Sequence, residues 1–487
     1  MQKNRPGALW ALLATSIPMF MVSLDNLVVT NALTEMSADF HVGQAELQWV
    51  VNGYVLAFAG LLLAGAALGD RFGRRRIFVW GILLFTLGSA ACGLADSAGQ
   101  LVAARVLQGA GAAAILPVSL TLAVAAVPPA RRALAVGVWG GVNGLGVAVG
   151  PLAGGLVTEG LDWHWIFWIN VPVGLAALPL ALWAIRESRG RAAALDVTGI
   201  LLATSAVVSA VWGIVGAADH GWGGARTLGG LAAAGLLLTV FAVHERRVPE
   251  PLVPLAMYRI RPFMLSNAVS LAMYFGVFGS IFFLAQFMQG PMGYTPFGAG
   301  LRTLPWTAAP MIVVPIASAL VPRVGGGILQ ALGCAMQAAA LGWIALLIGP
   351  DVSYPALVPA LALAGVGMGL VFAAVPATVI GSVAEHEHNK ASGVNNTVRE
   401  FGGALGIAVL TTVFTHAFDA GLSHGPRSAF EDGLRQSLWL GVAVVLAGAL
   451  AALFIRRPGR AVRIAAPTAA AVPRVAEPKV LAAADPD

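Results

Sequence analysis

Long apolar stretches separated by short polar segments run along the chain from residue 8 to residue 454. A helix that crosses a membrane needs about 20 predominantly apolar residues. Fourteen stretches approach or exceed this length: 8–33, 47–68, 77–95, 101–127, 133–157, 165–185, 197–217, 228–243, 263–287, 298–321, 328–348, 356–380, 393–414 and 434–454. The eighth stretch is the shortest. The pattern predicts an all-α integral membrane protein with 14 transmembrane helices.

Composition supports a membrane protein, because 58% of the residues are hydrophobic and only 11% are charged. Soluble domains have about a quarter charged residues. The net charge of +6 does not indicate nucleic acid, since the arginines are clustered in short segments between apolar stretches. Cys92 and Cys334 lie inside apolar stretches, so we expect them to be packing residues and expect neither a disulfide nor a metal site.

The basic residues predict the orientation. With the N-terminus inside, 23 of the 29 Lys and Arg residues lie in inner segments and two in outer loops. Cytoplasmic loops hold such an excess, so we expect a multi-pass protein of the cytoplasmic membrane with both termini cytoplasmic. A signal peptide is the alternative for the first stretch, but its length and Asp25 favour a retained helix. The Ala- and Pro-rich segment 456–487 is expected to be a disordered tail.

An internal repeat divides the chain. A shift of 256 residues aligns several glycines, among them Gly109 with Gly365, Gly111 with Gly367, Gly137 with Gly393, Gly146 with Gly402, and Gly150 with Gly406. They fall on the fourth and fifth stretches and on the twelfth and thirteenth. We therefore predict two pseudo-symmetric six-helix bundles, 1–190 and 259–455, with two inserted transmembrane helices and a linker at 191–258. Such halves usually rock around a central site.

Two charged residues lie within predicted helices, Asp25 in the first and Arg105 in the outer half of the fourth, about a turn from the loop. A charge within a membrane helix costs about 2.5–3.5 kcal/mol and usually faces a polar cavity with a partner. A carboxyl group that is occluded in one conformation and hydrated in another can carry a proton. The alternatives are that Asp25 caps or pairs with neighbouring polar groups and that Arg105 snorkels to the outer surface.

Two further segments indicate moving parts. The loop after the second stretch contains Asp70, Arg71, Gly73, Arg74 and Arg75, and an acid at a helix end can form ion pairs in one conformation and lose them in another. Anchoring by positive charge explains the arginines but not the Asp and Gly spacing. The fifth stretch has small residues at i, i+4 spacing and a proline that favours a bend: Gly146, Gly150, Pro151, Gly154 and Gly155. Generic tight packing is the alternative for these glycines.

These segments resemble signatures of the major facilitator superfamily. Residues 66–75 resemble its loop motif, with Ala66 at the first glycine position, and residues 105–111 resemble its fourth-helix motif Arg-x-x-Gln-Gly-x-Gly. Residues 146–155 resemble the exporter motif Gly-x-x-x-Gly-Pro-x-x-Gly-Gly. Residues 24–34 resemble the first-helix motif of the 14-span drug:proton antiporters, with departures at Leu27, Thr30, Asn31 and Thr34. Residues 163–172 and 391–403 resemble further signatures of that family.

The resemblance implies an exporter that exchanges a lipophilic drug or antibiotic, with a cation as one option, for protons. Asp25 and Arg105 would take part in proton transfer, and the loop at Asp70 would gate the cytoplasmic side. No cofactor is expected, because a proton gradient supplies the energy and no Gly-x-x-x-x-Gly-Lys-Ser/Thr loop occurs. The expected partners are the lipid bilayer, the drug and protons, without nucleic acid, and the expected state is a monomer.

Large aromatic and occasional polar side chains in the apolar stretches suit an adaptable pocket, although lipid-facing aromatics explain many of them. The candidates are Asn26, Gln48, Trp49, Asn52, Tyr54, Asn143, Tyr274, Phe278, Gln286, Arg302, Trp306 and Glu400. Glu400 could instead form an ion pair with Arg399 near the cytoplasmic end of its span. His386 and His388 have no partner at metal spacing, so we expect a solvated loop there.

Other functions fit the sequence less well. A dedicated exporter of a single endogenous metabolite or self-made antibiotic could use the same residues. A membrane enzyme is disfavoured, because the apolar stretches hold no paired acids, His clusters or nucleophile with a nearby base. A sensor without transport is disfavoured by Asp25 and the glycine motif.

Overall fold

The computed structural model describes residues 7–29, 32–128, 132–189, 196–249, 251, 253, 255–384 and 387–455, and their regular structure is helical. The α-helices are α1 (Ala8–Val28), α2 (Leu33–Phe40), α3 (Gln44–Phe72), α4 (Arg74–Cys92), α5 (Ala98–Ala125), α6 (Arg132–Gly160), α7 (Trp165–Trp168), α8 (Asn170–Ala184), α9 (Val197–His220), α10 (Ala225–Glu245), α11 (Arg261–Gln289), α12 (Pro296–Thr307), α13 (Ala309–Val324), α14 (Gly326–Leu347), α15 (Tyr354–Gly381), α16 (His388–Gly421) and α17 (Pro426–Leu453). Two 3-10 helices are η3 (Leu255–Arg259) and η5 (Leu422–His424).

Each of the predicted stretches overlaps a helix. Twelve of the described spans are long and apolar enough to cross a membrane, and α3, bent by 47°, would make a thirteenth. The 29-residue helix α6 lies where the fifth stretch is predicted. The eighth stretch is longer than predicted, since α10 has 21 residues. The chain is thus an all-α multi-pass membrane protein.

Two predicted spans are interrupted. The sixth is divided into α7 and α8 at Ile169, and the tenth into α12 and α13 at Ala308. Pro172 and Pro310 follow these breaks by two or three residues. Because proline has no N–H to donate to the residue four positions earlier and its ring collides with that carbonyl, each proline disfavours a continuous helix there.

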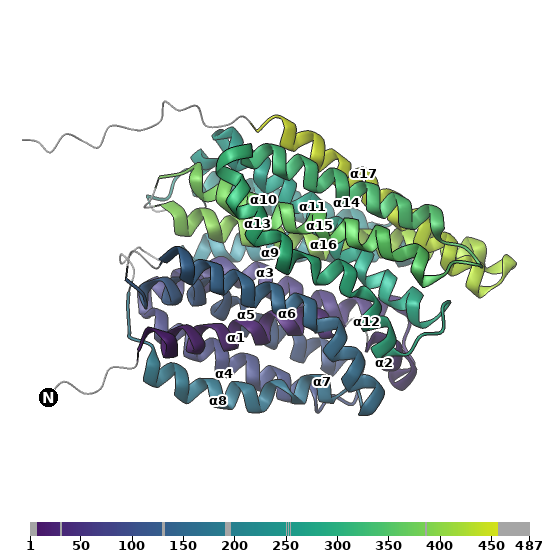
Figure 1. Cartoon of the computed structure of the whole chain (residues 1–487), viewed down its shortest axis with the longest axis horizontal. Helices are drawn as coiled ribbons and strands as arrows, with labels where there is room; N and C mark the ends of the chain where they lie inside the picture. Colours follow the sequence, from purple (N-terminus) through teal and green to yellow (C-terminus); the bar gives the residue numbers. More distant parts are fainter. Residues whose placement is uncertain are drawn as a thin grey trace, which may run out of the picture.

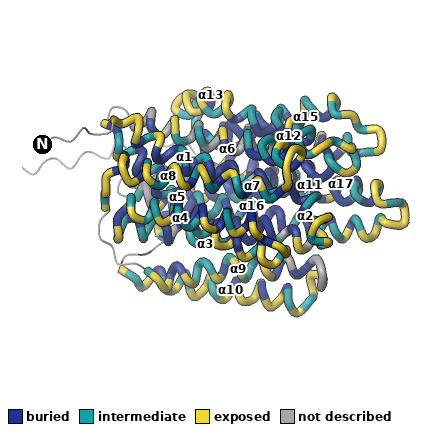
Figure 2. The backbone as a smooth tube through the Cα atoms, turned by 90° about the horizontal axis from the view of Figure 1, so that it is seen from below, coloured by how far each residue is buried: buried dark blue, intermediate teal, exposed yellow. Residues whose placement is uncertain are grey.

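The helices form two bundles that lie side by side (Figure 1). Helices α1 and α3–α8 pack with one another in the first bundle, and α11–α17 pack in the second. Between them, α9 contacts both α3 and α16, and α10 packs on α9. Figure 2 shows α10 at the edge of the molecule, with much of its length exposed. The inserted pair therefore joins the two bundles through α9.

The predicted repeat is visible in the packing of its glycines. A Cβ atom at Gly109 would collide with the backbone of α3, and one at Gly365 with the backbone of α12. Gly146 packs closely on α1, and Gly402 on α11. Since α3 and α12 contain the second span of each half, and α1 and α11 the first, the aligned glycines make equivalent contacts.

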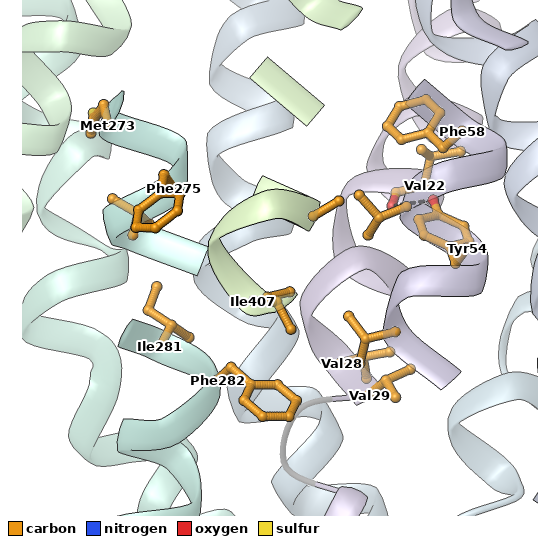
Figure 3. Close-up of a cluster of buried hydrophobic side chains, with 14 of the residues drawn as sticks. Val22, Val28, Val29, Tyr54, Phe58, Met273, Phe275, Ile281, Phe282 and Ile407 are labelled. Atoms are coloured by element: carbon orange, nitrogen blue, oxygen red, sulfur yellow. Dashed lines mark hydrogen bonds between the residues drawn. The ribbon is translucent and has the colours of Figure 1, made fainter. Parts of the chain in front are cut away.

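Buried side chains of both bundles belong to one hydrophobic cluster (Figure 3). It includes Val22 and Tyr54 from the first bundle and Phe275, Phe282 and Ile407 from the second. The bundles are therefore in apolar contact in this conformation.

Figure 1 shows that α1 begins and α17 ends at the same end of the molecule. We name it the basic end, because the arginines of the α3–α4 loop lie there together with Arg323 at the end of α13. The other end, where α2, α7 and α12 lie, is named the opposite end (Figure 1).

Candidate functional site

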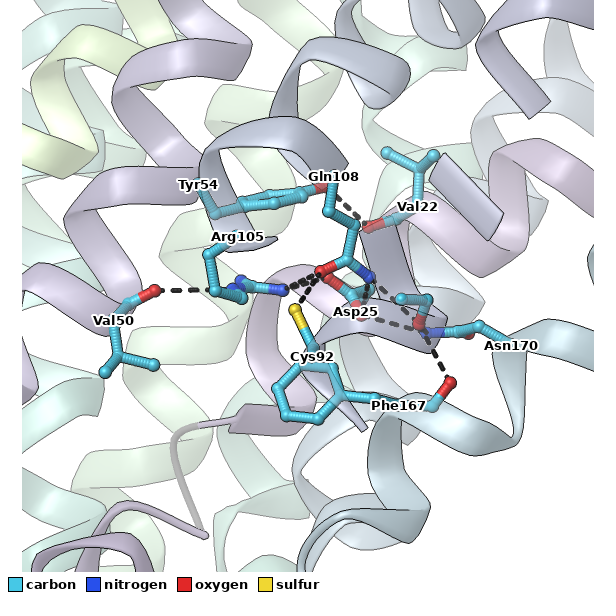
Figure 4. A network of polar contacts seen from close by, with 10 residues as sticks. Val22, Asp25, Val50, Tyr54, Cys92, Arg105, Gln108, Phe167 and Asn170 are labelled. Atoms are coloured by element: carbon cyan, nitrogen blue, oxygen red, sulfur yellow. Dashed lines mark hydrogen bonds and ion pairs between the residues drawn. The ribbon is translucent and has the colours of Figure 1, made fainter. Parts of the chain in front are cut away.

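Asp25 on α1 forms a buried ion pair with Arg105 on α5. Arg105 Nη1 lies 2.5 Å from Asp25 Oδ2, and both side chains are almost completely buried. Two amide groups also donate to Asp25 Oδ1, from Gln108 Nε2 at 2.8 Å and from Asn170 Nδ2 at 3.0 Å (Figure 4). The Asp25 carboxylate is therefore held by three donors. Arg105 has a partner at depth, and its 0% exposure excludes snorkelling to the surface.

Arg105 has further partners that fix its position. Its Nη1 donates to Gln108 Oε1 at 2.7 Å and its Nε donates to the Val50 carbonyl at 3.3 Å. The ring centroid of Tyr54 lies 4.1 Å from the guanidinium carbon, which is a cation–π contact. Arg105 and Gln108 reach Asp25 together because residues at i and i+3 lie on the same face of a helix.

Gln108 and Asn170 were not predicted as site residues, although both lie in strings that resemble family signatures. Each is a polar residue within an apolar stretch, and this signal could have identified them. Ser89 on α4 completes the network, because its hydroxyl accepts from Asn170 Nδ2 at 3.1 Å and from Gln108 Nε2 at 3.3 Å. Four helices thus contribute to the surroundings of Asp25.

A narrow cavity lies between the two bundles. It is lined by Val22, Ser23 and Asn26 of α1, Phe58 of α3, Leu116 of α5, Tyr274, Val277, Phe278 and Ile281 of α11, Met368 and Phe372 of α15, and Arg399 and Glu400 of α16. Four of the predicted pocket residues are among them: Asn26, Tyr274, Phe278 and Glu400. We name this space the central cavity.

Arg399 and Glu400 form an ion pair in the wall of the central cavity, with Arg399 Nη2 3.3 Å from Glu400 Oε1. The Asn26 side chain also donates a hydrogen bond to Glu400. The Arg399 guanidinium carbon lies 5.0 Å from the ring centroid of Tyr274. The expectation that this pair lies near the end of its span is wrong. Helix α16 begins at His388, so Glu400 lies about three turns inside it.

The other pocket candidates do not line the central cavity, or their side chains lie outside the described part of the structure. Tyr54 packs on Arg105. Arg302 lies at the opposite end, where its guanidinium carbon is 3.7 Å from the ring centroid of Tyr294. The lining of the central cavity does not include Trp49, Asn52, Gln286, Arg302 or Trp306. The side chains of Gln48, Asn143 and Pro151 lie outside the described part of the structure.

The loop between α3 and α4 contains an ion pair within its own segment. Arg74 Nη2 lies 2.7 Å from Asp70 Oδ1. Both side chains line a second cavity, which reaches Trp139 of α6 and Asn396 of α16. This cavity lies between the bundles toward the basic end. Arg71 is exposed beside this pair.

The start of α4 is fixed by Glu187, which was not predicted. The Glu187 carboxylate accepts the backbone N–H groups of Arg75 at 3.0 Å and Arg76 at 3.2 Å. Gly73 has φ 113°, and a Cβ atom there would lie 2.7 Å from Glu187 Cδ. The Arg75 guanidinium donates to the Ile185 carbonyl at 3.3 Å. Gly73 therefore permits the contact that joins α4 to the end of α8.

The glycines of α6 face two different helices. A Cβ atom at Gly146 would lie 2.6 Å from Ser23 Cβ of α1, and Gly154 also packs on α1. A Cβ atom at Gly155 would lie 2.6 Å from Phe297 Cα of α12, which belongs to the second bundle. The motif thus supports close packing within the first bundle and between the bundles near the opposite end.

Within the described residues, no group of three or more His, Cys, Asp or Glu side chains is placed to hold a metal ion. His386 lies outside these residues, and so does the side chain of His388.

Two helical bundles that enclose a cavity and hold a buried ion pair define a membrane transporter. The chain belongs to the Major Facilitator Superfamily, whose family model matches residues 15–407. It is 36% identical over 407 residues to the tetracenomycin C resistance and export protein of Streptomyces glaucescens, covering 83% of this chain and 76% of that protein. It is 39% identical over 437 residues to the puromycin resistance protein pur8 of Streptomyces alboniger, covering 87% and 85%.

Solved structures show the same fold. A bacterial homologue of the lysosomal transporter Spinster, inward-facing and unoccupied, aligns with a TM-score of 0.63 at 18% identity, covering 93% of this chain and 98% of that one. A POT family transporter aligns with a TM-score of 0.67 at 13% identity, covering 92% and 94%. The family model and the related export and resistance proteins show that the chain is a transporter of the drug and antibiotic efflux family and not an enzyme, as its motifs predict.

Proposed function

We propose that this protein exports a lipophilic drug or antibiotic from the cytoplasm in exchange for protons by alternating access. The observation that carries the proposal is the Asp25 carboxylate, which is 0% exposed and held by Arg105, Gln108 and Asn170. Burial of a carboxylate in a membrane helix is energetically costly. Carboxylates in such positions therefore typically mark a functional site. The names of the related export and resistance proteins support a drug or antibiotic as the cargo.

Asp25 would carry the proton. In its ionised form it pairs with Arg105 and stabilises this conformation. Protonation removes the negative charge and leaves Arg105 without a counter-charge in a buried position, which is unfavourable. The protonated state therefore favours a different arrangement of α1 and α5, and this preference couples proton binding to the conformational change.

The two ends of the molecule would open in turn. Close packing of Gly155 on α12 supports a closed opposite end, and the cavity beside Asp70 supports an open basic end. The excess of Lys and Arg at the basic end favours a cytoplasmic position for it and for both termini. The gate there would consist of Asp70, Arg71, Gly73, Arg74 and Arg75. The Asp70–Arg74 pair would exchange partners when the basic end closes.

A second candidate is export of a single antibiotic or endogenous metabolite. It is favoured by relatives whose names each give one compound, such as tetracenomycin C and puromycin. Cells that express the protein would be challenged with chemically unrelated compounds. Resistance to one structural class supports the dedicated exporter, and resistance to several supports the multidrug exporter.

Replacement of Asp25 by Asn tests the proton coupling. The carboxamide has a similar shape but cannot titrate, so purified protein in liposomes should lose export driven by an imposed proton gradient. Asp432→Asn is the matched control, because Asp432 pairs with Arg435 on the surface, with a 44% exposed side chain. Gradient-driven export that is unchanged in Asp25→Asn rejects the role of Asp25.

A further inference from the structure

The central cavity has two charged residues in its wall, and they carry opposite charges. Glu400 pairs with Arg399 and also accepts a hydrogen bond from Asn26. Asp25 and Arg105 are paired with each other and do not line the cavity. The wall therefore has no net charge that would attract a cation or an anion. A cation would also have to displace Arg399 or Asn26 from Glu400.

Two polar atoms of the same wall lack a partner among the described residues. Asn26 donates to Glu400 through its amide nitrogen, but its Oδ1 is buried and accepts no hydrogen bond. Arg399 donates through Nη2, but its Nε is buried and donates to no acceptor. Buried polar groups are nearly always satisfied by protein, water or ligand. Both atoms belong to residues that line the cavity, so they become one free acceptor and one free donor when the cavity widens.

Aromatic rings form another part of the wall. Tyr274 stacks with both Phe278 and Phe372, with ring centroids 5.4 Å and 5.5 Å away and planes inclined by 20° and 22°. Phe278 and Phe372 are only half-buried. Near-parallel aromatic faces favour offset stacking of another flat ring. The remaining lining is apolar, apart from Ser23.

In this conformation the central cavity has a volume of about 30 Å³, which is room for little more than a water molecule, so it must widen before it can hold a ring compound. We propose that the widened central cavity binds a neutral, planar aromatic compound that carries both a hydrogen-bond donor and a hydrogen-bond acceptor. The donor binds Asn26 Oδ1, the acceptor binds Arg399 Nε, and the ring stacks on the aromatic wall. This inference rests on the proposed export function only in treating the bound compound as cargo.

Three tricyclic compounds of similar size test the proposal. Acridone has an N–H donor and a carbonyl acceptor, 10-methylacridone keeps only the acceptor, and 10-methylacridinium is a planar cation with neither group. Binding to the purified full chain in detergent, without a gradient, is measured by fluorescence. Acridone should bind roughly tenfold more tightly than 10-methylacridone, because a tenfold change in Kd corresponds to the loss of about one hydrogen bond. The cation should bind more weakly than acridone.

Variants connect this selectivity to the cavity. Asn26→Leu removes the free acceptor, so acridone and 10-methylacridone should bind with similar affinity. Arg399→Lys keeps the charge but loses Nε, so both neutral compounds should bind more weakly. Arg435→Lys is the matched control, since Arg435 pairs with Asp432 away from the cavity, and it should leave all three affinities unchanged.

The outcomes are distinct. Tighter binding of the cation, an unchanged preference for acridone in Asn26→Leu, or no binding of any of the three compounds would overturn the proposal. Asp25→Asn should still bind acridone, because Asp25 does not line the cavity. If the predicted binding pattern holds but a proton gradient drives no acridone export, the proposed function fails and the binding site remains.

Discussion

Alanine substitution of two adjacent glycines should have different consequences. Gly154 packs on Val28 of α1, within the first bundle, whereas Gly155 packs on Pro296 and Phe297 of α12, in the second bundle. A Cβ atom at Gly155 would lie 2.5 Å from the Pro296 carbonyl carbon. Backbone atoms cannot move aside as a flexible side chain can. In Gly155→Ala the two bundles must therefore move apart at this contact.

The magnitude follows from this geometry. Overpacking of a tight contact costs about 1–3 kcal/mol. In Gly155→Ala the cost applies only while the opposite end is closed, since the bundles move apart when it opens. The ratio of open to closed molecules should therefore rise by about 5–150-fold. In Gly154→Ala the overpacking destabilises the open and the closed conformation equally. The free energy of unfolding therefore falls, and the ratio of open to closed molecules is unchanged.

Distance measurements between spin labels test this difference. The spin labels are attached to cysteines that replace Leu161 and Leu422. These two residues are 55% and 47% exposed and lie at the opposite end, on different bundles. The native Cys92 and Cys334 are buried and should not react. Gly155→Ala should increase the population of long distances. Gly154→Ala should keep the original distribution but unfold at a lower temperature. The reasoning is refuted if Gly155→Ala leaves the distances unchanged, or if both variants shift them equally.

Two further predictions concern buried carboxylates. Arg105→Ala removes the charged partner of the buried Asp25 carboxyl group, so the free energy of unfolding in detergent should fall by about 3–5 kcal/mol, and adding Asp25→Asn should restore part of it; no recovery would argue against the pair. Burial raises the pKa of Asp196, but hydrogen bonds from His244 and the Gly199 amide outweigh it and hold the pKa below its ordinary value. The lowered pKa stabilises the fold at neutral pH, and this contribution is lost as the pH falls below about 4. Unfolding temperatures of wild type and His244→Ala should therefore differ at pH 7 and converge in acid, and an equal difference at both pH values would contradict this prediction.

The sequence was sufficient to predict the helices and to place the charged residues Asp25 and Arg105 within them. Apolar length predicts a span because the bilayer requires it, and a charge in such a span needs a partner. The sequence could not predict that Asp25 and Arg105 are each other's partner, nor that Asn170 joins them. These contacts join α1, α5 and α8, and their alignment depends on how the helices pack. Spacing along one helix contains no such information.

Glu400 illustrates the same limit for the length of a span. The polar residues that precede it are typical of a loop, so the sequence predicts that the span begins at Gly393. In the structure α16 is 34 residues long, and its polar first turns lie between the bundles beside the second cavity. Polarity indicates contact with water or other polar groups, and in a transporter both occur within the helical bundle.

Asp25 and Asn26 are consecutive residues of α1 that face different sites. Asp25 contacts the donors on α5 and α8, and Asn26 contacts Glu400 on α16. Successive side chains of a helix point about 100° apart, so one turn of α1 faces both the ion pair and the central cavity. A turn of helix moves as a rigid unit. In the proposed cycle, a cargo that binds Asn26 Oδ1 and moves this turn of α1 therefore also shifts Asp25 relative to Arg105, and no longer pathway is needed to couple the two sites.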